Sequence, residues 1–190
     1  NQDPVGNGAA VATLVVMLAA LFFAVRAVLR PEGRLPQPPR WVMPALAVVG
    51  IGVAAYLAFV ETTGARAVCG PVGDCNTVQQ SSYAKLFGLL PVGVLGLVGY
   101  VAIIGAWLFT AGEPSRLRTR ARLALWIGAL GGTLFSIYLT FLEPFVIGAT
   151  CAWCLTSSLV VTLVLLAATP GGVKEIRSWT VRPPSRWPCP

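Results

Sequence analysis

The stretch WVMPALAVVGIGVAAYLAFV, residues 41–60, contains no charged side chain. A helix needs about 20 mostly apolar residues to cross the hydrocarbon core of a bilayer. A strand of a membrane barrel instead alternates apolar and polar residues over about ten positions. This continuous apolar run therefore predicts a transmembrane helix.

Four further apolar runs of similar length lie along the 190-residue chain. They cover Ala9–Leu29, Leu89–Phe109, Leu123–Leu142 and Ala152–Thr169. Charged residues make up 11% of the chain, whereas a soluble domain carries about 25%. The sequence predicts an all-α integral membrane protein with five transmembrane spans.

The basic residues predict the orientation of these spans. The net charge is +7, and in a five-span arrangement twelve of the fourteen Lys and Arg residues lie on one side. Cytoplasmic loops carry such an excess, so we expect the N terminus outside and the C terminus in the cytoplasm. The same distribution explains the positive charge without a nucleic-acid partner. The twelve residues are Arg26, Arg30, Arg34, Arg40, Arg116, Arg118, Arg120, Arg122, Lys174, Arg177, Arg182 and Arg186.

The first span lacks the features of a cleaved signal peptide. No basic region precedes it and no small-residue cleavage site follows it, so we expect a membrane anchor. A basic, proline-rich linker, RPEGRLPQPPR at residues 30–40, separates this span from the other four. We therefore expect residues 1–40 to form a separate unit.

Four cysteines fall on the predicted outer side. The stretch AVCGPVGDCN, residues 67–76, places Cys69 and Cys75 in a loop rich in Gly and Pro, and Cys151 and Cys154 open the fifth span. Disulfides form and persist on the outer face of a bacterial inner membrane and in the lumen of the endoplasmic reticulum. This placement favours a redox function.

The sequence Cys-Ala-Trp-Cys at the start of the fifth span is typical of a redox-active pair. A spacing of three puts Cys151 and Cys154 on one helix face, close enough to bridge. Thr150 is the predicted N-cap. The helix N terminus stabilises a thiolate, so we expect a lowered pKa for the nearer cysteine. The same Cys-x-x-Cys spacing also occurs in metal sites.

The four cysteines are also compatible with a metal site or with structural disulfides. Two cysteine pairs suit a tetrahedral zinc site, although an oxidising compartment and the absence of histidine disfavour it. Cys69 and Cys75 alone are typical of a structural disulfide, as in a non-enzymatic membrane subunit. A Cys-x-x-Cys disulfide closes too short a loop to stabilise much, so two pairs on one face favour a relay by thiol–disulfide exchange. A transporter is disfavoured because the spans hold almost no charge.

The stretch CNTVQQSSYAKLFGLLPVGVLGLVGY, residues 75–100, followed later by Cys151-Ala-Trp-Cys154, resembles the vitamin K epoxide reductase family. The resemblance is to the bacterial branch that generates disulfides, and it covers about Trp41 to Thr169. In DsbB-type oxidases the Cys-x-x-Cys pair comes in the first outer loop, whereas here it comes last. The matching positions are Cys75, Val78, Ser81, Tyr83, Ala84, Phe87, Gly88, Pro91 and Gly96.

This resemblance implies a domain organisation. Residues 41–170 are expected to form a four-helix catalytic bundle that encloses a quinone, with an outer redox loop at residues 61–88 lying over it. The first helix is expected to pack outside the bundle. Residues 171–190 are expected to form a cytoplasmic basic tail, in which Cys189 is a spare thiol.

The resemblance also implies a role for each cysteine. Cys69 is expected to form a mixed disulfide with an external partner, and Cys75 to carry electrons to Cys151. Cys154 is expected to face the quinone. The quinone is expected to be menaquinone or ubiquinone, and no metal is expected to take part. The partner is expected to be a separate DsbA-like protein of thioredoxin fold, because no such domain follows the last span. The protein is thus expected in the bacterial inner membrane, with its active site at the periplasmic face. The alternative function is reduction of a quinone epoxide instead of disulfide formation.

The contacts to the quinone are expected to differ from those of vertebrate relatives. Val92 and Ser158 stand where those proteins carry an Asn and a Tyr that bond the quinone carbonyls. With Cys154, we expect Ser81, Ser158, Val92 and Phe87 to contact the quinone, although Ser and Thr are also common packing residues of membrane helices.

Several acidic residues and glycines near the cysteines also have expected roles. Glu61 and Glu143 are expected at solvated outer helix ends, where either is a candidate proton route. Asp74 is expected to raise the pKa of Cys75. The loop glycines Gly64, Gly70 and Gly73 either let Cys75 swing or are ordinary turn residues. The glycines of the third span, Gly93, Gly96 and Gly99, are expected to allow close helix approach.

Overall fold

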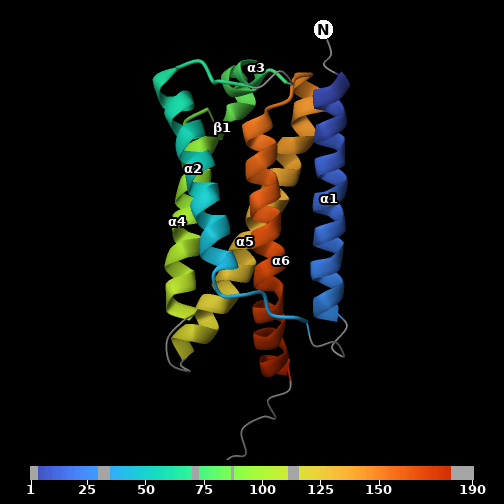
Figure 1. Ribbon diagram of the computed structural model, residues 1–190, viewed down its shortest axis with the longest axis vertical. Coiled ribbons are helices and arrows are strands. Elements are labelled where there is room, and N and C mark those ends of the chain that lie inside the picture. Colours follow the sequence, from blue (N-terminus) through green and yellow to red (C-terminus); the bar gives the residue numbers. More distant parts are fainter. Residues whose placement is uncertain (1–3, 30–34, 70–72, 87, 111–115, 181–190) are drawn as a thin grey trace, which may run out of the picture.

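The computed structural model describes residues 4–29, 35–69, 73–86, 88–110 and 116–180. Five long helices dominate it (Figure 1), and each is long and apolar enough to cross a membrane. The prediction of five spans is confirmed. The helices are α1 (Pro4–Leu29), α2 (Val42–Thr63), α4 (Val92–Thr110), α5 (Arg116–Leu142) and α6 (Ala152–Thr180).

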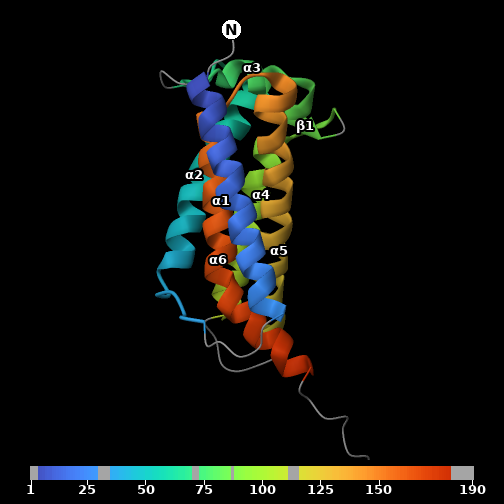
Figure 2. The ribbon, with the colours of Figure 1, turned by 90° about the vertical axis from the view of Figure 1, so that its right-hand side faces the viewer.

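Four of these helices form a closed bundle. Helix α2 packs against α4 and α6, and α5 packs against the same two helices on the other side. Helix α1 lies outside this ring, against α5 and α6, as the two views in Figures 1 and 2 show. The chain therefore has the expected four-helix core with an additional N-terminal helix.

Small residues bring α2 and α4 close together. A Cβ atom on Gly93 would lie 2.5 Å from the backbone nitrogen of Ala58, and one on Gly50 would meet the ring of Tyr100. The predicted packing role of Gly93 is confirmed. Gly99, by contrast, faces open space, so the spacing of three does not give every glycine the same role.

Short elements cover the end of the bundle that carries the cysteines. Helix α3 (Cys75–Gln80) lies across this end in Figure 1, followed by a 3₁₀ turn, η1 (Ser82–Ala84). Strands β1 (Lys85–Leu86) and β2 (Leu90–Pro91) then form a minimal antiparallel hairpin. The hairpin is the one departure from an all-helical chain among the described residues, and it is too short to change the fold class.

Helix α5 does not end in an ordinary turn. It continues into a π-helical turn, η2 (Glu143–Ile147), which Gly148 closes in the left-handed conformation, with its N–H donating to the carbonyl of Glu143. This turn returns the chain toward the bundle just before Cys151.

Helix α6 runs further than the sequence predicts. The apolar run ends at Thr169, but the helix continues through Pro170 to Thr180. The extension packs on α5: Glu175 accepts hydrogen bonds from Arg122 (2.9 Å) and Thr119 (3.2 Å). Part of the expected basic tail is thus helical, while Cys189 lies outside the described residues.

The two ends of the bundle differ in chemistry. All four cysteines that the sequence analysis singled out lie at the end where α1 and α6 begin. Basic residues such as Arg26, Arg40, Arg122 and Arg177 lie toward the opposite end. The fold therefore keeps the thiols away from the basic end.

Candidate active site

A disulfide joins Cys69 to Cys75 in the loop that follows α2. Cys75 begins α3 and is fully buried, whereas Cys69 is half-buried and follows Val68, which is 77% exposed. Cys69 is therefore the member of the pair that a second protein reaches more easily.

Asp74 caps the helix that carries Cys75. Its carboxylate accepts hydrogen bonds from the Thr77 backbone N–H (3.2 Å) and the Thr77 hydroxyl (2.6 Å). The Thr77 hydroxyl is the main cause that lowers the pKa of Asp74. Asp74 thus has a capping role that the sequence analysis did not assign. Because Cys75 is in a disulfide, the expected effect of Asp74 on its pKa stays a prediction.

Two aromatic side chains hold the backbone just before Cys69. The Val68 N–H donates to the Tyr56 hydroxyl (2.7 Å), and the Val68 carbonyl accepts from the Trp153 indole N–H (2.9 Å). The two rings lie against each other, 4.7 Å between centroids. Trp153 therefore ties the loop to α6.

The other end of the loop is bonded directly to the segment before α6. The Asp74 N–H donates to the Thr150 carbonyl (2.9 Å). Gly73 adopts φ +90° there, and a Cβ atom would lie 2.5 Å from the same oxygen, so the position requires glycine. Gly64 likewise ends α2 in the left-handed conformation. Both act as turn residues in this structure, and Gly70 lies outside the described residues.

Cys151 occupies the N-cap position of α6. The Cys154 N–H donates to the Cys151 sulfur (3.3 Å), and the helix begins at Ala152. The prediction that Thr150 is the N-cap is wrong, because the extended segment runs one residue further and turns the Thr150 hydroxyl to Asn7 of α1 (3.4 Å).

Cys151 and Cys154 are free thiols in this structure. Cys151 is fully buried and shares an apolar cluster with Cys75, while Cys154 is half-buried and lines a cavity. The pKa of Cys151 is lowered, chiefly by the hydrogen bond with the Cys154 thiol and further by backbone N–H donors. This direction agrees with the prediction, but the Cys154 thiol contributes more to it than the backbone N–H groups of the helix start.

Gln79 contacts both free thiols, which the sequence analysis did not foresee. Its side-chain nitrogen lies 3.7 Å from the Cys151 sulfur and 3.5 Å from the Cys154 sulfur. The available signal was its position four residues after Cys75, which places both on one face of a short helix.

The expectation of a solvated carboxyl group is wrong for Glu143, whereas Glu61 keeps part of its solvent exposure. Glu143 is 2% exposed, because the π-helical turn folds it beneath the Cys-x-x-Cys segment, where it accepts the Cys151 N–H (2.9 Å). Glu61 is half-buried and accepts the Gly93 N–H (2.7 Å). It thereby satisfies a backbone donor at the start of α4 that has no partner within the helix.

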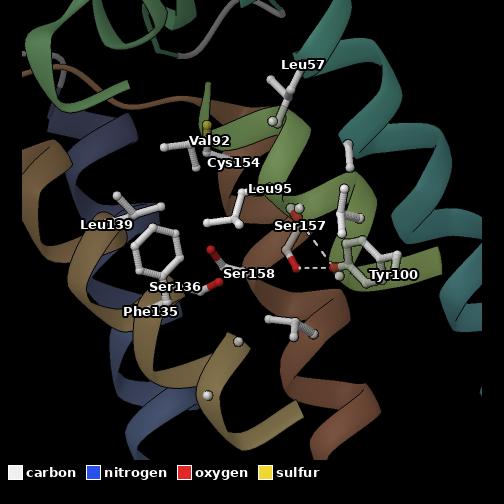
Figure 3. A pocket seen from close by; sticks show the side chains of 18 of the residues that line it. Leu57, Val92, Leu95, Tyr100, Phe135, Ser136, Leu139, Cys154, Ser157 and Ser158 are labelled. Atoms are coloured by element: carbon white, nitrogen blue, oxygen red, sulfur yellow. Dashed lines mark hydrogen bonds between the residues drawn. The ribbon is translucent and has the colours of Figure 1, made fainter. Parts of the chain in front are cut away.

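A cavity of about 560 Å³ lies inside the four-helix bundle. Small-molecule sites usually measure about 300–1,000 Å³. Its walls come from α2, α4, α5 and α6. The end near the cysteines is closed by α3 and η1. None of the described lining residues belongs to α1. Figure 3 shows much of its apolar lining, including Leu57, Val92, Leu95, Phe135 and Leu139.

The predicted quinone contacts partly line this cavity. Cys154, Val92, Ser81 and Ser158 are among its lining residues, whereas Phe87 lies outside the described part of the chain. Contact of these residues with a quinone stays a prediction.

The serine hydroxyls already have protein partners. The Ser158 hydroxyl lies 3.1 Å from that of Thr140, and Ser81 donates to the Val78 carbonyl (2.7 Å). Tyr100, which the sequence analysis did not single out, also lines the cavity and donates to the Ser157 carbonyl (2.9 Å). Glu61, Gln79 and Glu143 also line the cavity.

The four cysteines are not arranged as the ligands of one metal ion. Two of the four sulfurs are joined in the loop disulfide. Within the ranges that the structure describes, no group of three or more His, Cys, Asp or Glu side chains is placed to hold a metal ion.

Comparisons with known proteins agree with the fold and the site. The model of the vitamin K epoxide reductase family matches residues 41–169, which is the four-helix bundle with its loop and excludes α1. A comparison with curated proteins gives no match. The family match covers more than half of the chain and contains both cysteine pairs. The chain therefore belongs to the vitamin K epoxide reductase family of membrane thiol–quinone oxidoreductases.

Proposed function

We propose that this protein generates disulfides by passing electrons from an external dithiol protein to a membrane quinone. The observation that carries the proposal is the order of the four sulfurs. Cys69 is the accessible one, Cys75 and Cys151 are buried in one apolar cluster, and Cys154 lines the cavity. Electrons entering at Cys69 thus have a path of thiol–disulfide exchanges toward the cavity.

The first exchange takes place at the loop pair. A thiolate of the partner attacks the Cys69 sulfur, the Cys69–Cys75 bond breaks, and Cys75 leaves as a thiolate. The second thiol of the partner then displaces Cys69 and leaves the partner with its own disulfide. The loop pair has gained two electrons.

The second exchange moves these electrons inward. The Cys75 thiolate attacks the Cys151 sulfur of a Cys151–Cys154 disulfide, and Cys154 leaves as a thiolate. Cys69 then attacks Cys75, which restores the loop disulfide and releases Cys151. The structure has a loop disulfide and two inner thiols, which is the arrangement at the end of this step.

The cavity suits the head of a quinone, because Glu61, Gln79 and Glu143 line it and most of its remaining wall is apolar. Cys154, Val92 and Leu95 are among the residues that would hold it. A bound quinone accepts two electrons and two protons and becomes a hydroquinone. When Cys151 and Cys154 form their disulfide, their two electrons would pass to the quinone and their two thiol protons would leave into the cavity.

The partner is proposed to be a separate DsbA-like protein on the periplasmic side of a bacterial inner membrane. The basic residues at the opposite end of the bundle support this orientation. A DsbA-type dithiol has a reduction potential of about −120 mV, so only a strong acceptor drains it. A quinone pool that respiration keeps oxidised meets this requirement.

The test is quinone reduction by purified protein in detergent with a reduced DsbA-like protein. We expect quinone absorbance to fall with wild type and not with Cys69→Ala, Cys75→Ala, Cys151→Ala or Cys154→Ala. The control is Cys189→Ala, which is expected to behave as wild type. Turnover by the Cys69 and Cys75 variants would make the loop disulfide structural, and consumption of a quinone epoxide in place of quinone would favour the epoxide reductase alternative.

A further inference from the structure

The side chain of Gln79 lies against the inner thiols, and the proposed electron path does not use it. Its nitrogen lies within hydrogen-bond distance of both the Cys151 sulfur (3.7 Å) and the Cys154 sulfur (3.5 Å). Both bonds come from the same side-chain amide nitrogen. One amide group therefore serves both members of the pair.

A thiolate accepts such a bond much more strongly than a disulfide sulfur does, because the acceptor is charged. An N–H donor placed here stabilises the reduced pair relative to the oxidised pair. Stabilising the reduced form makes a disulfide a stronger oxidant. The neighbouring carboxyl group of Glu143, bonded to the Cys151 N–H, acts in the opposite sense on a thiolate.

The same short helix that carries Gln79 also carries Cys75. Helix α3 begins at Cys75 and ends at Gln80, and the Asp74 N–H bond to Thr150 holds its start against the segment before Cys151. Docking of α3 therefore brings the attacking thiol and the amide donor to the inner pair together.

We propose that Gln79 is a positioning residue that donates a hydrogen bond to the Cys154 sulfur as this sulfur leaves during the attack of Cys75 on Cys151, and that it thereby favours the reduced inner pair. In this step the Cys75–Cys151 bond forms, the Cys151–Cys154 bond breaks, and the electron pair stays on Cys154. A better-stabilised leaving thiolate departs faster. The inference rests on the proposed function for the direction of electron flow.

The decisive experiment isolates the inner pair in a Cys69→Ala/Cys75→Ala background and equilibrates it with dithiothreitol or glutathione redox buffers. Gln79→Leu removes the donor, and Gln79→Glu keeps the side-chain length but replaces the amide by a carboxylate. Gln80→Leu is the matched control, because Gln80 is the adjacent residue of the same type and is exposed.

We expect Gln79→Leu to shift the equilibrium toward the disulfide by about tenfold, which corresponds to about 30 mV for a two-electron couple. Gln79→Glu is expected to shift it further in the same direction, and Gln80→Leu to leave it unchanged. The pH midpoint for alkylation of Cys151 is expected to rise in the Gln79 variants alone, because they lose a donor to the thiolate. With all four cysteines present, quinone reduction by Gln79→Leu is expected to slow.

Equal redox equilibria for Gln79→Leu and Gln80→Leu would overturn the proposal. If Gln79→Leu fails to fold, the isosteric Gln79→Glu makes the same comparison. The redox equilibrium is measured without partner or quinone. Failure of the proposed function would appear in the quinone-reduction assay and not in this equilibrium. If wild type reduces no quinone but the Gln79 variants still shift the equilibrium, the donor role stands without the relay.

Discussion

Glu143 shows how a single residue connects the fold to the redox chemistry. Burying a carboxyl group lowers the stability of the fold unless the group is hydrogen-bonded. Here the Glu143 carboxyl group accepts a hydrogen bond from the Cys151 N–H. The same side chain lines the cavity beside Cys154. It therefore fixes the backbone of Cys151, and its place on the cavity wall makes it a candidate proton route.

The two effects of Glu143 are separable by substitution. Glu143→Gln keeps an acceptor for the Cys151 N–H, whereas Glu143→Ala leaves this buried donor unsatisfied. We expect Glu143→Ala to lower the free energy of unfolding by about 1–3 kcal/mol, and Glu143→Gln to lower it clearly less. Thermal or denaturant unfolding in detergent measures the difference. Equal losses for both variants would show that the hydrogen bond contributes little.

The pH profile of quinone reduction then tests the second effect of Glu143. If its carboxyl group carries protons, Glu143→Gln changes that profile although the protein stays folded. A profile identical to that of wild type would restrict Glu143 to a positioning role.

At the scale of elements, the loop that carries Cys69 and Cys75 is held at both ends. Tyr56 and Trp153 bind the backbone of Val68, and Asp74 binds the backbone of Thr150. A loop held in this way presents Cys69 outward while it keeps Cys75 beside the inner pair. The exchange between pairs is therefore expected to need local movement of α3 rather than opening of the bundle.

Gly73 and Gly64 form a matched pair for testing this docking. Both have positive φ, but a Cβ atom on Gly73 would meet the Thr150 carbonyl at 2.5 Å, while one on Gly64 would meet open space. Gly64→Ala is expected to cost only the strain of the left-handed conformation, about 1–2 kcal/mol. Gly73→Ala is expected to displace α3 as well and to slow quinone reduction at least tenfold.

The rate of quinone reduction per folded protein, together with the melting temperature of each variant, distinguishes the two glycines. The docking account predicts a rate defect in Gly73→Ala that exceeds any shared loss of stability. Equal rates in the two alanine variants would contradict it.

At the scale of the whole molecule, α1 is an addition to the four-helix core of the family. It contributes no described lining residue to the cavity, and the family match begins at residue 41. It packs against α5 and α6, and its buried residues include Gly6, Ala10, Ala20 and Ala24 beside the larger Leu14 and Met17. Packing between membrane helices relies on small residues of this kind.

Cleavage of the connection before α2 tests this independence. A protease site inserted at residues 35–40 allows α1 to be released after purification in detergent. We expect the remaining bundle to reduce quinone at a rate within about twofold of wild type and to melt at a lower temperature, because it loses packing against α5 and α6. Loss of activity at temperatures where the cleaved bundle stays folded would show that α1 takes part in the reaction.

Much of this architecture follows from local sequence. Each span is a continuous apolar run, and a run of that length has one solution in a bilayer, a helix whose backbone bonds are satisfied internally. The Cys-Ala-Trp-Cys motif predicts a redox pair at a helix start because its spacing and the helix end act over a few residues. The ends of the helices were less predictable, since α6 continues past Thr169 through its contacts with α5.

By itself, the sequence determined that the chain has five apolar helices, that its four relevant cysteines gather at one end, and that its motifs are those of the family. Only the tertiary structure decided which polar groups surround the thiols. Gln79 meets Cys154 across 75 residues of sequence, Trp153 meets Val68 across 85, and Glu61 meets Gly93 across 32. Such contacts depend on how helices pack and where a π-helical turn redirects the chain, and no local pattern encodes either.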